Sequence, residues 1–150
     1  LFYKMYELQL GGFNQFISHL EFSLKAIRHN KNPFIVGTIN IANYLEIEKA
    51  GKKNQMERFI DDLGITLSFL LRDIDYCTYK ENGEFWVAFP DIDLSIAKEK
   101  CSRLVDYIMQ TKFSDLSKSK LVLKYKLLEC NDKDNIHTIT TKIKEAKFNE

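Results

Sequence analysis

The segment Leu70–Asp91, with the sequence LLRDIDYCTYKENGEFWVAFPD, contains two apolar runs separated by a short polar stretch. Ile74–Tyr79 and Phe85–Phe89 are rich in β-branched and aromatic residues, which favour strands. The connection Lys80–Glu84 includes Gly83, and glycine readily adopts the backbone angles of a tight turn. The segment therefore predicts a β-hairpin.

On both sides of this hairpin, apolar residues recur every three or four positions, the spacing of amphipathic helices. We expect helices at Phe13–His29, from an Asn54 cap to Leu71, from an Asp93 cap to Ile108, and at Asn135–Lys147, with a short helical turn at Tyr44–Lys49. We expect two more strands, at Phe34–Ile41 and Leu121–Leu127. This order predicts an α+β sandwich with helices over a mainly antiparallel sheet.

Composition and charge indicate one globular domain in the cytoplasm. The 150 residues carry 22 basic and 21 acidic side chains, so a formal charge of +1 provides no overall field to attract DNA, RNA or an anionic membrane. No apolar run approaches the ~20 residues of a membrane helix, so we expect no direct membrane insertion in this segment. Cys77, Cys101 and Cys130 are odd in number and widely spaced, which favours buried thiols in a reducing compartment over disulfides.

Common catalytic motifs are missing. The three histidines are far apart in sequence and none pairs with a cysteine at metal-ligand spacing, so no metal site is predicted. There is neither a glycine-rich phosphate loop nor a nucleophile-elbow sequence. We therefore predict no cofactor.

The N-terminus has two open interpretations. Leu1, Phe2, Met5 and Leu8 follow a near-heptad spacing. Residues 1–9 are either the end of a connecting helix from a larger protein, which could be membrane-associated, or an N-terminal extension. Residues 10–150 form the predicted domain.

The element order and three short motifs resemble the GGDEF family, bacterial diguanylate cyclases that join two GTP molecules into cyclic di-GMP. Glu81-Asn82-Gly83-Glu84-Phe85 lies where the family has its Gly-Gly-Asp/Glu-Glu-Phe hairpin. Leu10–Asn14 is similar to the family's opening Leu-Thr-Gly-Leu-x-Asn, and Lys142–Lys147 to its closing Ala-Leu-Tyr-x-Ala-Lys. The resemblance covers Leu10 to the C-terminus and implies a nucleotide-cyclase-like sandwich.

The sequence differs from this family at the positions that bind metal and nucleotide during catalysis. The resemblance implies a metal-binding Asp-x-Asp-x-Phe on the first strand, where this chain has Asn40–Tyr44, and a catalytic carboxylate at Gly83. Leu45 replaces a phosphate-side lysine and Glu48 a guanine-reading asparagine, while Glu81 and Asn82 replace the two glycines. The positions that keep the family's residue types are Glu57, Glu84, Phe85 and Lys147. We therefore predict a degenerate domain, a pseudo-enzyme with no catalytic residues.

Arg72-x-x-Asp75 precedes the hairpin motif by five residues, and Arg103 lies twenty positions beyond Gly83. In this register the resemblance implies an inhibitory product site, with a stacked pair of cyclic di-GMP molecules held by Arg72, Asp75 and Arg103. A guanidinium can donate two parallel hydrogen bonds to guanine O6 and N7. A carboxylate such as Asp75 can accept from guanine N1–H and N2–H. The same spacing also fits ordinary helix-surface ion pairs, because Arg58 and Asp61 are likewise three apart.

These observations predict a cyclic di-GMP receptor that relays the second messenger to a fused or partner protein, with exopolysaccharide regulation as an analogy. Two alternatives stay open: a ligand-free dimerisation or interaction scaffold, and a regulatory domain that senses GTP through Glu57 and Lys147. We also expect Arg72 to be solvated without ligand, so that its removal leaves stability nearly unchanged.

Overall fold

The computed structural model describes residues 12–51, 53–110 and 121–149. Its elements are α2 (Phe13–Asn30), β1 (Phe34–Ile41), α3 (Tyr44–Lys49), α4 (Lys53–Leu70), β2 (Tyr76–Glu81), β3 (Glu84–Pro90), α5 (Leu94–Gln110), β4 (Leu123–Glu129) and α6 (Ile136–Glu145). The proposed connecting segment at residues 1–9 lies outside the described residues.

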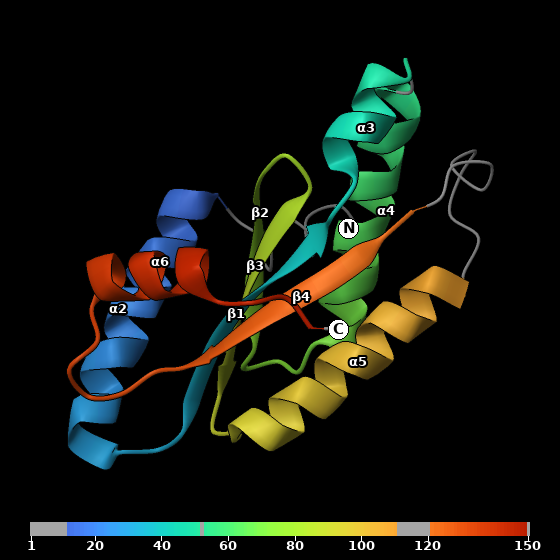
Figure 1. Cartoon of the computed structure of the whole chain (residues 1–150). Helices are drawn as coiled ribbons and strands as arrows, with labels where there is room; N and C mark the ends of the chain where they lie inside the picture. The colour runs from blue at the N-terminus through green and yellow to red at the C-terminus, as the bar shows by residue number, and fades with distance from the viewer. Residues whose placement is uncertain (1–11, 52, 111–120, 150) are drawn as a thin grey trace.

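The four strands form one antiparallel sheet in the order β2-β3-β1-β4. Helices cover both faces of this sheet: α2 and α6 lie on one side, and α4 and α5 on the other (Figure 1). The α+β sandwich expected from the sequence is therefore confirmed. None of the described helices combines the length and the apolarity needed to cross a membrane.

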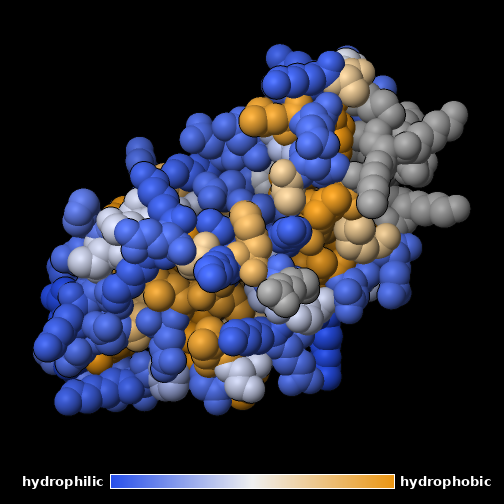
Figure 2. All heavy atoms as spheres, in the orientation of Figure 1, coloured by the Kyte–Doolittle hydropathy of each residue, from blue (hydrophilic) through white to orange (hydrophobic). Residues whose placement is uncertain are grey.

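Alternate residues of the central strand β1 supply two separate hydrophobic cores. Ile35 and Ile39 join the core under α4 and α5. Phe34 and Val36 join the core under α2 and α6. This two-sided burial explains why β1 reads as a continuous apolar run. In Figure 2 hydrophilic side chains cover most of the rim of the visible face, and hydrophobic ones lie toward its middle.

The pairing of β1 with β4 depends on Gly37. A Cβ atom at this position would lie 2.2 Å from the carbonyl oxygen of Lys126. Only glycine lets the two strands approach so closely here. This contact fixes the spacing of the two strands at the centre of the sheet.

Several helix and strand ends differ from the prediction. Asn54 is not a helix cap, because α4 already includes Lys53. The predicted cap at Asp93 is confirmed, since its Oδ1 accepts a hydrogen bond from the Ile96 N–H at 2.9 Å. The predicted strand at Leu121 begins two residues later, at Leu123, and extends to Glu129, where it still pairs with β1. The last helix ends at Glu145, because Ala146 is already extended.

Candidate functional site

The hairpin connection is shorter than the sequence suggested. β2 runs to Glu81 and β3 starts at Glu84, so only Asn82 and Gly83 form the turn. Their φ angles of +51° and +78° lie in the left-handed region. Asn-Gly is a favoured pair for such a two-residue turn, whose twist matches that of the strands. The predicted connection at Lys80–Glu84 is therefore wrong in length, because the strands pair further toward the tip.

The third position of the hairpin motif has no room for a side chain. A Cβ atom on Gly83 would lie 2.9 Å from Cβ of Ile41 and 3.1 Å from a ring carbon of Tyr44. The Gly83 N–H donates to the hydroxyl of Tyr79 at 3.0 Å, and its carbonyl accepts from the Ile41 N–H at 2.8 Å. The hairpin tip is therefore packed tightly against the end of β1.

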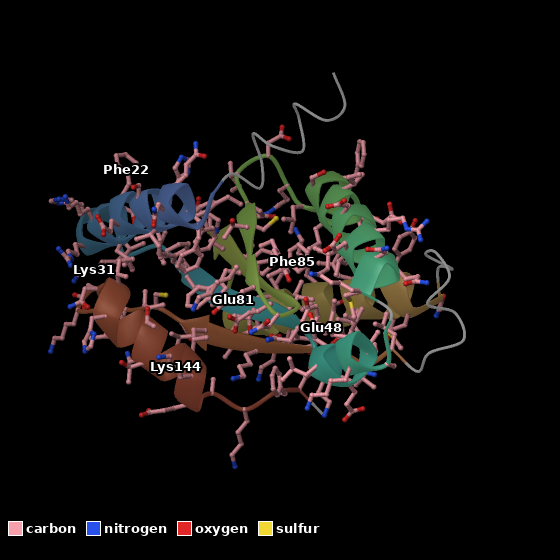
Figure 3. All side chains as sticks on the ribbon, turned by 90° about the horizontal axis from the view of Figure 1, so that it is seen from above. Phe22, Lys31, Glu48, Glu81, Phe85 and Lys144 are labelled. Atoms are coloured by element: carbon pink, nitrogen blue, oxygen red, sulfur yellow. The ribbon has the colours of Figure 1, made fainter. Side chains whose placement is uncertain are left out.

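Tyr44 and Tyr79 lie next to the hairpin tip at this end of the sheet. Tyr44 is hydrogen-bonded to Glu48 and Tyr79. Burial, together with the Glu48 carboxylate, raises the pKa of Tyr44 to about 12, so its phenol is neutral at physiological pH. Figure 3 shows Glu48 and Glu81 on the same side of the molecule, and Figure 1 places α3 and the hairpin at the same end of the sheet. This end combines neutral phenols with carboxylates, a poor environment for a triphosphate.

Asn40 and Ala42 lie at the two acidic positions of the expected metal pattern, and the asparagines of this segment make structural hydrogen bonds. Asn40 accepts a hydrogen bond from the Thr38 hydroxyl at 2.7 Å. Asn43 accepts one from the Val122 N–H at 3.1 Å, which ties β1 to the start of β4. Among the described residues no group of three or more His, Cys, Asp or Glu side chains is placed to hold a metal ion.

The other motif positions are spread around the molecule. Leu45 is largely exposed and Phe85 is fully buried in the core under α4 and α5. Glu57 lies exposed on α4, and Lys147 follows α6 in an exposed segment whose Asn149 bonds to the edge of β4. β1 separates β4 from the hairpin in the sheet order.

Arg72 and Asp75 form a compact turn at the opposite end of the strands from the hairpin tip (Figure 1). Asp75 accepts the Arg72 backbone N–H at 2.8 Å, and the guanidinium bonds to both carboxylate oxygens, with Nη2 at 2.7 Å from Oδ1. Nη2 of Arg72 also donates to the Pro90 carbonyl at 2.7 Å. The side chain of Asp75 is completely buried. This turn begins β2 at Tyr76 and leaves Ile74 exposed, which explains why the strand starts later than predicted.

The expectation that Arg72 is solvated without ligand is wrong. Its guanidinium is an internal partner of the buried Asp75 carboxylate, although about a third of the side chain reaches solvent. Charge-assisted hydrogen bonds to a buried carboxylate stabilise a fold by about 1.5–3 kcal/mol. Arg72 therefore has a structural role in addition to any role in ligand binding.

Lys100 on α5 connects this turn to a surface groove. Its Nζ lies 3.0 Å from Oδ2 of Asp75 and 5.5 Å from the centre of the Phe89 ring. Lys100 also lines a groove of about 490 Å³ between α4 and α5, whose other lining residues are Leu70, Ile96, Glu99, Arg103, Leu104 and Tyr107. We call this the α4–α5 groove.

Arg103 projects from α5 along the same groove. It is largely exposed and pairs with Glu99, with 2.5 Å between Nη2 and Oε1. Because Lys100 both contacts the buried Asp75 and lines the groove, it connects the Arg72–Asp75 turn to Arg103. Sequence reasoning missed Lys100, since it lies 25 residues from Asp75 and only the packing of α5 brings the two together.

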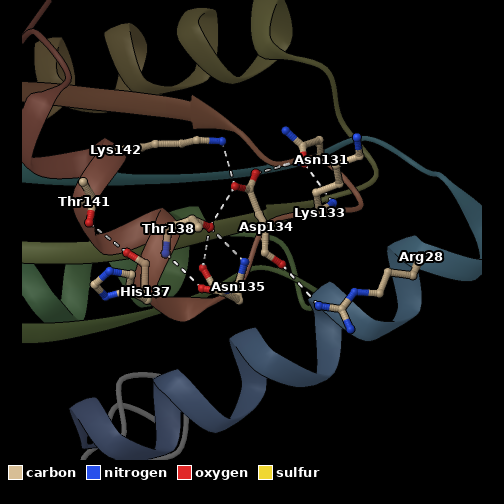
Figure 4. Close-up of polar contacts among 9 residues, drawn as sticks. All are labelled: Arg28, Asn131, Lys133, Asp134, Asn135, His137, Thr138, Thr141 and Lys142. Atoms are coloured by element: carbon tan, nitrogen blue, oxygen red, sulfur yellow. Dashed lines mark hydrogen bonds and ion pairs between the residues drawn. The ribbon is translucent and has the colours of Figure 1, made fainter.

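A second polar cluster lies at the start of α6 (Figure 4). The buried carboxylate of Asp134 accepts hydrogen bonds from the Asn131 N–H at 2.9 Å, the Thr138 hydroxyl at 2.9 Å and the Lys142 ammonium at 2.7 Å. Arg28 of α2 donates to the Asp134 carbonyl at 3.4 Å. Burial alone would raise the pKa of Asp134, but these donors outweigh it and lower the pKa below its ordinary value. This cluster anchors α6, and the sequence analysis did not identify it.

No protein-family model matches the sequence, and no curated protein matches it. Solved structures resemble the fold closely. The GGDEF domain of DgcB from Caulobacter crescentus, in complex with c-di-GMP, superposes with a TM-score of 0.80 at 9% identity, over 91% of this chain and 82% of that one. The active GGEEF domain of a diguanylate cyclase from Vibrio cholerae gives 0.80 at 12% identity, over 91% and 88%.

A third similar structure contains a protein partner. The diguanylate cyclase SiaD from Pseudomonas aeruginosa, in complex with its activator SiaC, gives a TM-score of 0.77 at 11% identity, over 89% of this chain and 52% of that one. At such low identities these likenesses establish the fold alone. The chain has a GGDEF-like fold.

Proposed function

We propose that this chain is a GGDEF-like domain that does not synthesise cyclic di-GMP and instead binds it as a receptor, in the region formed by the Arg72 turn and the α4–α5 groove. The observation that carries the proposal is the contact of Lys100 with the buried Asp75 carboxylate, which joins the Arg72–Asp75 pair to the groove lined by Arg103. Three cations next to an apolar groove suit a ligand with two phosphates and two flat bases.

The hairpin end of the sheet supports the non-catalytic half of the proposal. Phosphoryl transfer between nucleotides relies on metal ions held by carboxylates that neutralise developing charge. Gly83 leaves no space for a carboxylate, Asn40 is engaged in a hydrogen bond with Thr38, and Ala42 has no side-chain oxygen. The GTP-sensing alternative loses support for the same reason, and because Glu48 and Glu81 add negative charge at that end.

The α4–α5 groove supports the second part of the proposal, that the chain binds cyclic di-GMP. Its walls include Leu70, Ile96 and Leu104, whose apolar surfaces can pack against purine faces. A volume of about 490 Å³ lies within the range of small-molecule sites. Arg103 can exchange its exposed bond to Glu99 for a bond to a phosphate, because an exposed ion pair contributes little.

Isothermal titration of the chain with cyclic di-GMP tests the proposal, and Arg103→Ala is the variant of choice. Arg72→Ala would also remove an internal partner of Asp75, so its effect on binding could not be separated from an effect on the fold. We expect wild-type binding in the micromolar range or tighter and a loss of about 10–100-fold in Arg103→Ala, the value of one good guanidinium contact.

Arg58→Ala is the matched control, since Arg58 is also an exposed arginine on a helix but does not line the groove. Its affinity should equal that of the wild type, and both variants should melt at the wild-type temperature. Formation of cyclic di-GMP from GTP and Mg²⁺ would contradict the non-catalytic half. The absence of binding heat, together with an unshifted melting temperature, would reject the receptor function and favour the ligand-free scaffold. Light scattering would then test whether that scaffold dimerises. Relay to a fused or partner protein is the expected consequence of binding.

A further inference from the structure

We propose that this site accepts cyclic dinucleotides as a class, and that Lys100 is the residue that removes selectivity for guanine. The inference rests on the proposed function and concerns what the same site can distinguish. Its basis is the carboxylate of Asp75, the group expected to read the guanine edge.

Every acceptor position of Asp75 is already occupied. A carboxylate offers about four lone-pair positions. Asp75 receives four donors: the backbone N–H, Nε and Nη2 of Arg72, and Nζ of Lys100, at distances of 2.7–3.1 Å. The side chain has no exposed surface. Guanine N1–H and N2–H need two adjacent acceptor positions, and Asp75 has none to offer.

Lys100 is held firmly in this arrangement. Its ammonium bonds to Oδ2 of Asp75 and lies over the Phe89 ring, and only 21% of its side chain is exposed. Displacing it would break a charge-assisted hydrogen bond and a cation–π contact together. Asp75 is therefore a positioning residue that orients the two cations.

The guanidinium of Arg72 also cannot offer two parallel donors to one guanine. Nε and Nη2 point to Asp75, and Nη2 also serves the Pro90 carbonyl, which leaves Nη1. Reading guanine O6 and N7 takes two parallel donors from the fork of one guanidinium. The remaining Nη1 can still donate a hydrogen bond to a phosphate oxygen.

The remaining contacts do not depend on the base. The cations Arg72, Lys100 and Arg103 and the carboxylates Asp75 and Glu99 leave one net positive charge, which attracts the phosphates that all cyclic dinucleotides share. Stacking on apolar walls accepts any purine, because every base has a π-face.

Titration of one protein with cyclic di-GMP and with cyclic di-AMP tests the inference. We expect wild-type dissociation constants for the two ligands within about tenfold of each other, since neither Asp75 nor Arg72 can make the paired hydrogen bonds that identify guanine. In Lys100→Met the apolar stem remains while one acceptor position of Asp75 becomes available. The affinity ratio should then shift toward cyclic di-GMP by about tenfold.

Lys98→Met is the matched control, because Lys98 is an exposed lysine on the same helix and does not line the groove. It should leave the ratio unchanged. A wild type that prefers cyclic di-GMP by more than about tenfold would overturn the inference while leaving the receptor function intact. An unchanged ratio in a folded Lys100→Met protein would overturn the role of Lys100. If neither ligand binds, the receptor function fails and the inference fails with it.

Discussion

At the scale of single residues, Gly83 determines whether a catalytic carboxylate could return to the hairpin. We expect Gly83→Asp to lower the free energy of unfolding by about 1–3 kcal/mol, because a side chain at φ +78° is strained and its Cβ would lie 2.9 Å from Cβ of Ile41. The variant should gain no cyclase activity, since one displaced carboxylate does not build a metal site. Urea unfolding and a GTP turnover assay measure the two effects.

Asn82→Asp is the control for this prediction. It adds the same negative charge at the neighbouring turn position, where φ is +51°, and aspartate tolerates that conformation. Its stability should stay within about 0.5 kcal/mol of the wild type. Equal stability of both variants would mean that the hairpin tip can rearrange around a side chain at position 83.

Residue-level prediction from the sequence succeeded where a contact is local. Arg72 and Asp75 are three positions apart, and the structure joins them. Their membership of a binding site stays a prediction. The contact of Lys100 with Asp75 and the contact of Tyr44 with Tyr79 could not be predicted, because each pair meets only through the packing of distant elements. The hydrogen bond from Arg72 to the Pro90 carbonyl is also a tertiary contact, and it helps to hold a side chain that was expected to be solvated.

At the scale of elements, the buried Asp134 anchors the start of α6. We expect Asp134→Asn to lower the free energy of unfolding by about 1–3 kcal/mol at neutral pH, since an amide cannot replace a carboxylate that accepts from Lys142, Thr138 and the Asn131 N–H. The folded pKa lies below the ordinary value of 3.8, so the stabilisation is complete above that value and is lost as the pH falls through the folded pKa.

Urea unfolding of both proteins across pH measures this effect. The stability gap between wild type and Asp134→Asn should be constant near neutrality and shrink below about pH 4. Asp132→Asn, an exposed neighbour in the same turn, should show almost no gap at any pH. A gap for Asp134→Asn that persists at the lowest pH would assign the loss to packing rather than to charge.

Element ends show what sequence patterns can and cannot predict. Apolar periodicity, together with β-branched and aromatic content, located every described helix and strand, and β1 and α3 matched their predicted bounds. The predicted start of the last helix at Asn135 is close to the observed start at Ile136, and Asn135 is the N-cap, whose side chain accepts from the Thr138 N–H. The ends that moved, at β2, β3 and β4, are set by pairing with neighbouring strands, and no single strand sequence contains that information.

At the scale of the whole molecule, the sheet order β2-β3-β1-β4 places one core on each face of a shared sheet. Composition and element order predicted an α+β sandwich, but the strand order depends on which strands meet across long connections. The resemblance to GGDEF domains predicted a nucleotide-cyclase-like sandwich without a strand order, and the solved structures share the fold. The two cores share every strand of the sheet, which argues that they unfold together.

The three cysteines report on this cooperativity. Cys77 and Cys101 lie in the core under α4 and α5, and Cys130 lies in the core under α2 and α6. Burial raises the pKa of all three thiols, to about 12 for Cys101 and Cys130, so the reactive thiolate is scarce and inaccessible.

We expect no reaction with a thiol reagent in the native protein at mildly alkaline pH and full reaction of all three cysteines in concentrated guanidinium. In intermediate urea, mass spectrometry of the labelled peptides should show the same urea dependence at each cysteine, because only global unfolding exposes them. Earlier labelling of Cys130 would mean that α2 and α6 open independently, and a ligand in the α4–α5 groove would then protect Cys77 and Cys101 but not Cys130.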